Sequence, residues 1–167
     1  MQFEFKTLSP DAVPMALAKA ERYRLLNEPG QAESICLDAL AVDPDNQQAL
    51  VMLLLALTDQ FERGQTIVTR AWETVSLVRD EYERQYYSGL IHERRARALI
   101  RSGTPRGGPR AYEWLSAAMA CYQQAEGLRP PSNDDALLRW NACVRLIMSD
   151  PHLAPVVDEP TEVLFQE

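Results

Sequence analysis

The apolar positions along the chain recur with the spacing of amphipathic helices. In the segment GQAESICLDALA, the residues Ala32, Cys36, Ala39 and Leu40 fall at i, i+4, i+7 and i+8, so they share one face of a helix. Turn signals bound this run, with NEPG before it and DPDN after it. Because proline disfavours helical geometry in the residue before it, the pattern predicts a short helix that ends at Pro44.

A second apolar face precedes this one and ends at NEPG; it comprises Ala16, Ala20, Tyr23 and Leu26. Two short antiparallel helices joined by a tight turn cannot bury their own apolar faces, so such a pair needs stacked neighbours. The fold class expected for the whole chain is all-α. The predicted helices lie near 11–26, 30–41, 46–60, 63–79, 81–102, 109–127 and 133–148.

The first helix pair resembles the tetratricopeptide repeat, a helix–turn–helix unit of about 34 residues. That motif has a small residue and a tyrosine in its first helix, then an alanine, an aromatic residue and an alanine in its second, then a proline. The matching positions here are Ala20, Tyr23, Ala32, Cys36, Ala39 and Pro44. Ala16, Lys19 and Cys36 depart from the motif, because larger apolar residues are usual at these positions.

The C-terminal part of the chain repeats this spacing, and Tyr122 supplies the aromatic residue that Cys36 replaces in the first copy. The repeating residues are Ala118, Tyr122, Ala125, Leu128 and Pro130. The resemblance implies a tetratricopeptide-like α-solenoid over residues 11–149. This would be a right-handed superhelical stack of antiparallel helix pairs, with about three repeats and a closing helix.

The chain departs from the family between its two clear copies. Pro44 and Pro130 stand 86 positions apart, about 18 more than two periods of about 34 residues require. We assign the excess to an extended helix near 81–102 and to an inserted loop, SGTPRGGPR, near 102–110. Residues 1–10 form an N-terminal segment outside the expected helical domain.

The composition suits one soluble globular domain, with 46% hydrophobic and 25% charged residues. A net charge of −7 disfavours binding to nucleic acid or to anionic membranes, because phosphate repels a negative surface. The longest apolar run, ALVMLLLAL, is too short to span a bilayer as a helix. The first residues show no secretory signal, so we expect a cytoplasmic protein. The three cysteines lack CxxC spacing, which favours reduced, buried thiols over disulfides or a zinc site.

Catalytic chemistry has little support in the sequence. His92 and His152 are the only histidines, and no recognised catalytic or nucleotide-binding motif occurs. We therefore expect no enzyme activity, no metal and no cofactor, and we expect His92 to be solvated or ion-paired on its charged helix. The glycine-rich loop could offer backbone amides to an anion, although no lysine follows it in the register of a phosphate-binding loop.

Six arginines and a single acid, Glu93, lie between positions 93 and 110, which makes a positive island in an acidic protein. The arginines are Arg94, Arg95, Arg97, Arg101, Arg106 and Arg110. One interpretation is a solvated face whose arginines pair with acids elsewhere in the fold. The other is a docking site for an acidic peptide or a phosphorylated group, because guanidinium groups bind oxyanions bidentately.

The resemblance also implies that the first helix of each pair lines a concave surface. The residues placed there are Leu17, Glu21, Arg24, Val51, Leu55, Thr58, Leu137, Asn141 and Val144. The helix that contains ALVMLLLAL is apolar nearly all round, so it should be covered on most sides, either by a bound peptide or by the chain itself. Helix 81–102 or the tail would supply such a cover. Some family members grip a chaperone's C-terminal carboxylate, but Leu17, Glu21 and Met52 supply no such clamp.

The three tryptophans, Trp72, Trp114 and Trp140, lie at helical spacing beside alanines and leucines. They are expected to pack between helices, with an exposed aromatic anchor at an interface as the alternative. Prolines argue against a helix in residues 150–167, whose sequence EVLFQ resembles a protease-recognition sequence used in recombinant proteins. We therefore place this tail outside the expected fold.

Together these features predict a non-enzymatic adaptor that presents a concave, partly apolar surface and an arginine-rich edge to a protein or peptide partner. One alternative is a structural subunit of a homo-oligomer or of a larger assembly. Another is a regulator that binds an anion or small ligand at the loop near 102–110. No nucleic acid and no membrane partner is expected.

Overall fold

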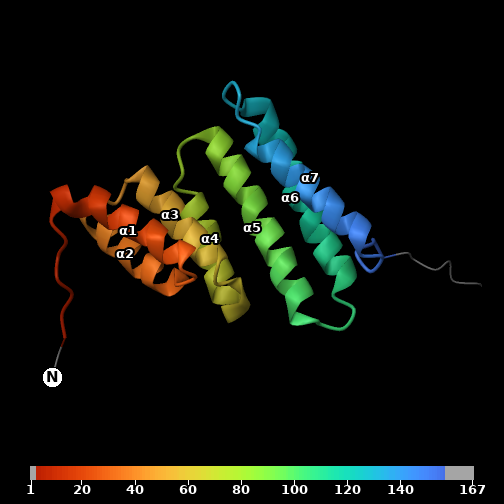
Figure 1. Ribbon diagram of the computed structural model, residues 1–167, viewed down its shortest axis with the longest axis horizontal. Helices are drawn as coiled ribbons and strands as arrows, with labels where there is room; N and C mark the ends of the chain where they lie inside the picture. The colour runs from red at the N-terminus through yellow and green to blue at the C-terminus, as the bar shows by residue number, and fades with distance from the viewer. Residues whose placement is uncertain (1–2, 157–167) are drawn as a thin grey trace, which may run out of the picture.

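Residues 3–156 are described by the computed structural model, and they contain helices and no strand (Figure 1). The elements are η1 (Pro10–Ala12), α1 (Val13–Leu25), α2 (Pro29–Val42), α3 (Gln47–Thr58), η2 (Phe61–Arg63), α4 (Gln65–Val75), α5 (Glu81–Ser102), α6 (Gly108–Leu128) and α7 (Asp135–Ser149). This confirms the all-α class, and each helix lies close to its predicted range. No helix in this part of the chain has the length and apolar character that crossing a membrane requires.

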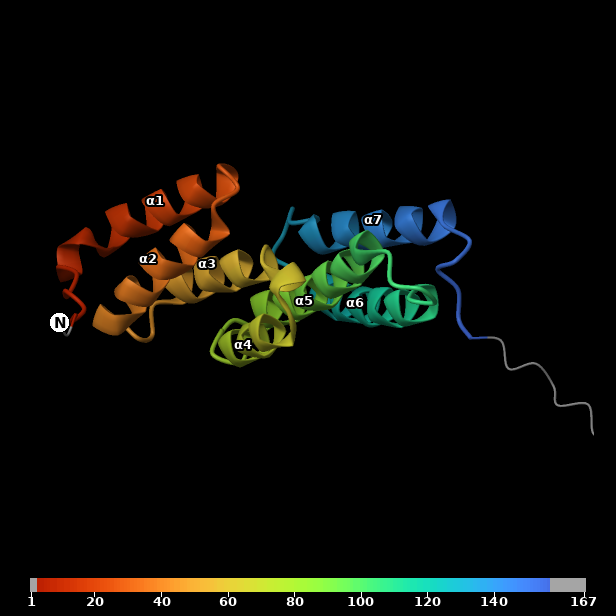
Figure 2. The same ribbon diagram turned by 90° about the horizontal axis from the view of Figure 1, so that it is seen from below.

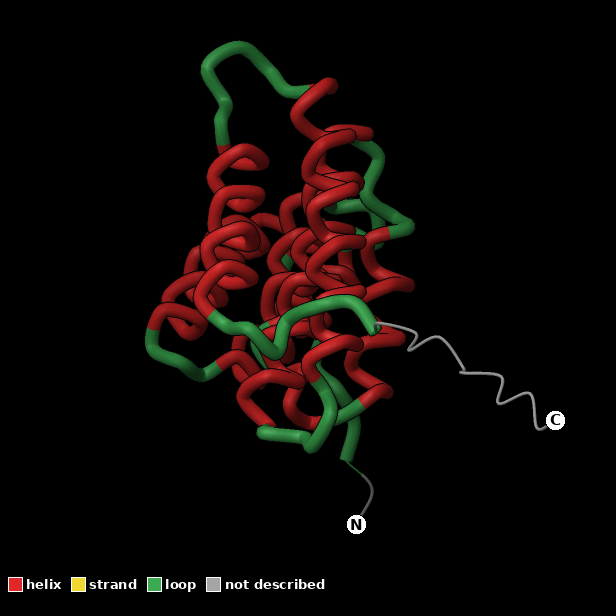
Figure 3. Tube along the Cα trace, turned by 90° about the vertical axis from the view of Figure 1, so that its right-hand side faces the viewer, coloured by secondary structure: helices red, strands yellow, loops and turns green. Residues whose placement is uncertain are grey.

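Each helix packs against the next one along the chain, from α1 on α2 to α6 on α7. The helices follow one another from left to right in Figure 1, and α1 and α7 stand on the same side of the array in Figure 2. Seen from the α7 end, the helix axes run in similar directions and the loops gather at the two ends (Figure 3). Short connections between antiparallel neighbours explain this order.

Local signals set the helix ends. Asn46 caps α3, because its side-chain oxygen accepts a hydrogen bond from the backbone N–H of Ala49 at 2.9 Å. Asp80 caps α5 in the same way through the N–H of Glu83 at 2.8 Å. Gly103 ends α5 in the left-handed conformation with φ of 63°, which glycine adopts without strain.

Two clusters of buried side chains form the core, and α5 joins them. The first cluster lies among α1 to α4 and includes Ile91 of α5. The second lies among α5, α6 and α7, and Ala96 of α5 belongs to it. Because the two residues lie on different faces of one helix, α5 packs against both halves of the molecule.

Two expected helices differ at their ends. The helix predicted at 63–79 stops at Val75, and residues 76–80 form the connection to α5. The helix predicted at 46–60 stops at Thr58 and is followed by the short turn η2. Gly64 then reverses the chain into α4 with φ of 117°. A residue with a side chain would be strained in this backbone conformation.

The first part of the tail belongs to the fold, which corrects its placement outside it. Leu153 is only 4% exposed and packs in the second core cluster. Asp150 holds this turn, since its side chain accepts from the N–H of His152 at 2.9 Å and its carbonyl accepts from the N–H of Leu153 at 3.0 Å. A Cβ atom on Gly108 would collide with the carbonyl of His152, so the tail crosses the start of α6 where only glycine fits. The EVLFQ sequence lies outside the described residues.

Candidate functional site

The arginines of α5 do not form one basic face. Residues 95 and 97 are separated by about 200° around the helix axis, so Arg95 and Arg97 point to nearly opposite sides. Arg94, Arg97 and Arg101 each pair with a carboxylate of this chain, whereas no carboxylate of residues 3–156 pairs with Arg95. The α5 part of the positive island therefore divides into three paired arginines and Arg95, which has different neighbours.

Arg94 takes part in a link between three helices. Its guanidinium contacts Asp59 at 2.8 Å, and Arg24 of α1 contacts the other oxygen of the same carboxylate at 2.7 Å. Both arginines and Asp59 are partly buried, which limits screening by water. Arg24 and Arg94, both expected at a partner surface, thus hold α1 and α5 against the end of α3.

Arg97 belongs to a second network, centred on a fully buried carboxylate. Glu93 is 0% exposed and accepts hydrogen bonds from Arg97 at 2.9 Å and from the hydroxyl of Tyr122 at 2.6 Å. Arg139 of α7 lies 3.5 Å from the same carboxylate. Burial, followed by the charge of Glu93, raises the pKa of Tyr122, so the phenol remains a donor. The network joins α5, α6 and α7, and it satisfies a charge that burial alone would destabilise.

Arg95 lies in different surroundings, on the side of α5 that faces α4 and α6. Its guanidinium carbon stands 4.1 Å from the centre of the Trp114 ring, a cation–π geometry. One of its nitrogens donates to the side-chain oxygen of Gln65 at 3.1 Å. Burial, and then the positive charge of Arg110, lowers the pKa of Arg95. Within residues 3–156, no carboxylate forms an ion pair with Arg95 or Arg110.

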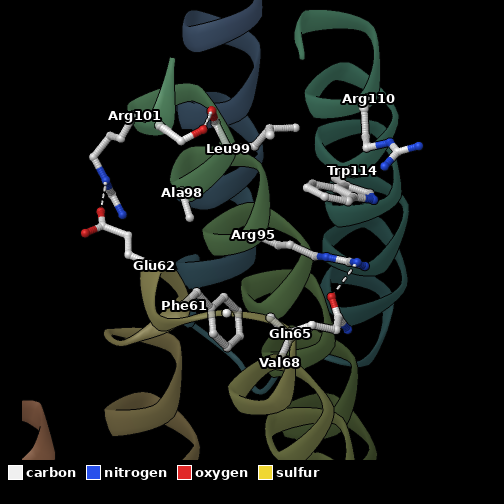
Figure 4. Close-up of a pocket in the computed structure, with 12 residues that line it drawn as sticks. Phe61, Glu62, Gln65, Val68, Arg95, Ala98, Leu99, Arg101, Arg110 and Trp114 are labelled. Carbon is white, nitrogen blue, oxygen red and sulfur yellow. Dashed lines mark hydrogen bonds and ion pairs between the residues drawn. The ribbon is translucent and has the colours of Figure 1, made fainter. Parts of the chain in front are cut away.

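These two arginines border a cavity of about 520 Å³ between η2, α4, α5 and α6, which we call the basic pocket (Figure 4). Arg110 and Trp114 come from α6, and Arg95 reaches from α5 to lie between Trp114 and Gln65. The lining residues are Phe61, Glu62, Gly64, Gln65, Val68, Arg95, Ala98, Leu99, Arg101, Ser102, Arg110 and Trp114. The volume is within the range of ligand-binding clefts.

The start of α4 adds to the positive potential of the basic pocket. Gly64 and Gln65 line it, and no side chain caps this helix. Uncapped N–H groups at a helix start carry a partial positive charge. Glu62 is the one acidic side chain in the lining, and it is paired with Arg101 at 2.7 Å. The pocket thus combines apolar walls with cationic groups that no acid of residues 3–156 neutralises.

The other residues expected at a partner surface are dispersed. Leu17 is 1% exposed and Thr58 is 3% exposed, so their expected surface role is corrected to core packing. Glu21 is exposed on α1. The remaining residues are half-buried on α3 and α7: Val51, Leu55, Leu137, Asn141 and Val144. The described part of the tail does not cover α3, because residues 150–155 lie against the loop at 103–109.

The structure also tests the expectations for His92 and for the three cysteines. His92 is half-buried and forms no ion pair among residues 3–156; its ring packs edge-on against Trp72 with a ring-centroid distance of 4.8 Å, and its Nδ1 atom is buried without a hydrogen-bond partner. Burial lowers the pKa of His92, and the charge of Arg95 adds to this effect. The cysteines follow the expectation more closely, because Cys36 and Cys143 are buried free thiols, although Cys121 is half-buried.

Phe61, Gln65 and Val68 are among the pocket residues that sequence reasoning missed. The turn η2 and the uncapped Gly64 that bring them to α5 break the helical periodicity, so the sequence offered no signal for them. Trp114 had a signal, because it follows Arg110 by one helical turn on α6. Among the described residues, no group of three or more His, Cys, Asp or Glu side chains could hold a metal ion.

Comparisons of the chain with protein-family models, with curated proteins and with solved structures found no match. The function of the basic pocket is therefore inferred from the residues that line it.

Proposed function

We propose that the protein is a non-enzymatic adaptor that binds an acidic peptide segment of a partner protein in the basic pocket. The observation that carries this proposal is the pair Arg95 and Arg110, which have no acid partner within residues 3–156 and border a cavity with Trp114 in its wall. A partner carboxylate would supply the missing acceptor, and an adjacent apolar side chain would contact Trp114 and Phe61.

The pocket geometry favours a peptide over a nucleotide. Apolar side chains from η2, α4, α5 and α6 contribute to its walls and would pack against apolar side chains of a peptide, whereas its arginines would bind a carboxylate or a phosphate equally. The protein's charge of −7 repels polyanions at long range, so recognition depends on this local positive site. The proposed ligand is therefore a short segment with two or more acidic residues next to an aromatic or aliphatic one.

The proposal includes the architecture implied by the resemblance, a tetratricopeptide-like stack of helix pairs. Small residues at the motif positions have the burial that such packing requires. Ala20, Ala32, Cys36, Ala39, Ala118 and Ala125 are all 0% exposed. Tyr122, the aromatic residue of the second copy, is also buried. Such stacks usually bind partners on their extended concave surface.

Fluorescence anisotropy with a fluorescein-labelled acidic peptide, DEFEDLE, tests this function. We expect Arg95→Glu and Arg110→Glu each to weaken binding about tenfold or more, since charge-assisted hydrogen bonds contribute about 1.5–3 kcal/mol. Arg145→Glu is the matched control, because Arg145 is exposed on α7 outside the pocket. Equal binding by all three variants would refute the proposal.

A structural subunit remains the second candidate, on the evidence of an apolar groove between α6 and α7. Its volume is about 390 Å³, and its lining includes Met119, Trp140, Val144 and Met148. Met148 is 81% exposed, which is high for a large apolar side chain next to a groove. Multi-angle light scattering separates the structural role from the adaptor role. A stable oligomer favours the structural role, whereas a monomer whose molar mass is unchanged in the Met148→Lys variant rejects it.

A further inference from the structure

Exposed apolar side chains gather at the two ends of the helix array. Among residues 3–156, eleven large apolar side chains are exposed; six lie in residues 3–37, four lie in residues 128–156, and Leu77 lies between these two groups. The N-terminal segment and α7 stand at opposite ends of the array in both views (Figures 1 and 2). Stacked helical proteins need a polar outer face on their terminal units to remain soluble. Apolar side chains interrupt that face at both ends here, so each end is suited to contact another molecule.

The N-terminal end offers two aromatic rings on an extended segment. Phe3 is 87% exposed and Phe5 is 100% exposed, and residues 3–9 form no helix before η1. Leu8 packs against the first core cluster and holds the segment beside α1. In an extended chain, alternate side chains point to the same side, so the two rings would stand about 7 Å apart on one side.

The opposite end offers an apolar groove between α6 and α7. Its volume is about 390 Å³, and none of its nine lining residues is charged. Trp140, Val144 and Met148 line it from α7 at intervals of four residues, which places them about 6 Å apart along the helix axis. This spacing is close to that of Phe3 and Phe5 in an extended segment. The two rings can therefore contact successive turns of α7.

We propose that Phe3 and Phe5 of one copy bind the α6–α7 groove of a second copy, so that copies associate head to tail. The segment cannot fill the groove of its own chain. Residues 3–8 span at most about 22 Å, whereas four helices stand between α1 and α6, and packed neighbours lie about 8–10 Å apart.

The charges at the two ends favour the head-to-tail arrangement. Residues 3–46 carry eight acidic and four basic side chains, whereas residues 103–149 carry four acidic and five basic ones. Two N-terminal ends therefore repel each other, and an N-terminal end attracts the end formed by α6 and α7. Because such a contact joins two different surfaces, each pair of copies keeps one free surface of each kind and can extend into a row.

The contact is small, so the association should be weak. Two phenylalanine side chains bury roughly 300–500 Å², and a similar area of the groove brings the total to roughly 600–1,000 Å². A stable interface buries about 1,600 Å². Copies should therefore associate reversibly at high protein concentration. The groove shares no lining residue with the basic pocket, so the inference is independent of the proposed function and names an occupant for the groove of the structural alternative.

Multi-angle light scattering of the full chain from about 10 μM to about 1 mM tests the inference. The wild-type mass should rise with concentration and pass beyond the dimer. The double variant Phe3→Ser, Phe5→Ser should raise the Kd about a hundredfold. So should Ala120→Lys, Met148→Lys, since both side chains are exposed at the groove. Added lysines attract the acidic end, so this loss would report apolar contact and not repulsion. Leu77→Ser, exposed away from both ends, is the matched control and should leave the mass unchanged.

Mixing the two double variants gives the sharpest outcome. Each variant keeps one intact surface, so each should be monomeric alone, and the mixture should form dimers and no larger species. That result supports the inference. A wild type that stays monomeric up to about 1 mM, a wild type that stops at the dimer, a double variant that associates like wild type, or a mixture without dimers overturns it. DEFEDLE binding should be the same in both double variants as in wild type, so failure of this inference leaves the proposed function standing.

Discussion

Gly89 of α5 lies directly against the Tyr122 ring of α6, and its replacement by alanine tests how the second half of the molecule is packed. A Cβ atom at this position would lie 2.6 Å from Cε1 and 2.8 Å from Cδ1 of Tyr122. Optimal contact between carbon atoms is about 3.5–4.0 Å, so the ring would have to move by about 1 Å. Tyr122 is 1% exposed and its hydroxyl is bound to Glu93 at 2.6 Å, which prevents a simple rotation out of the way.

The expected cost follows from these contacts. Overpacking a dense core costs about 1–3 kcal/mol. Displacing the ring also weakens a hydrogen bond to a charged acceptor, which contributes about 1.5–3 kcal/mol. Alanine is better than glycine inside a helix by about 1 kcal/mol, which offsets part of the loss. We therefore expect Gly89→Ala to lower the free energy of unfolding by about 2–4 kcal/mol and Tm by about 5–15 °C.

Urea unfolding and thermal melting measure this effect, and Gly127 provides the matched control. Gly127 is also helical, near the end of α6, but a Cβ atom there would meet nothing within 4 Å. Gly127→Ala should therefore stabilise the protein by up to about 1 kcal/mol. The variant Tyr122→Leu removes the ring, and in that background Gly89→Ala should cost much less. If both glycine variants changed stability equally, the proposed steric contact would not exist.

Three further predictions follow from buried groups. Replacing Glu93 by alanine leaves two arginines without their carboxylate and should cost about 3–5 kcal/mol in urea unfolding; a loss below 1 kcal/mol would contradict the network. Burial, and then the charge of Arg95, holds the pKa of His92 in the folded protein below its unfolded value of 6.5. The contribution of neutral His92 to the free energy of unfolding is therefore complete above pH 6.5 and is lost as pH falls through the folded pKa. Between pH 7 and pH 5 the wild type should lose more stability than His92→Phe; parallel pH profiles would count against this. Burial raises the pKa of Cys36 and of Cys143 to about 12, so both thiols should label slowly with iodoacetamide at pH 8 until urea unfolds the chain, and rapid labelling of Cys36 or Cys143 in the native protein, located by peptide mapping, would refute the burial.

The sequence was informative wherever structure depends on nearby residues. Turn signals such as NEPG and DPDN placed the ends of the first helices within about two residues, because capping and proline geometry act locally. The alanine spacing also indicated which faces are buried. The break between α3 and α4 was predicted at residues 61–62, within about two residues of the start of α4, but the turn η2 within it was not predicted, since such a short turn leaves only a brief interruption in an apolar pattern.

Only part of the candidate site could be predicted from the sequence. The sequence located the arginines and Trp114, but it could not divide the arginines by role. Arg94 has its partner 35 positions away at Asp59, and Arg101 has its partner 39 positions away at Glu62. Such pairs form only when separate helices meet, and no local rule specifies which helices do so.

By itself, the sequence determined that the described chain forms helices, where most of them begin and end, and which small residues lie between them, because these follow from helical periodicity and local hydrogen bonding. Only the tertiary structure decided that Leu17 and Thr58 are core residues, that Glu93 is a buried charge with three partners, and that Arg95 and Arg110 border one cavity. Those outcomes depend on how helices distant in the chain pack against one another. That packing is the joint result of many weak contacts between residues distant in the chain.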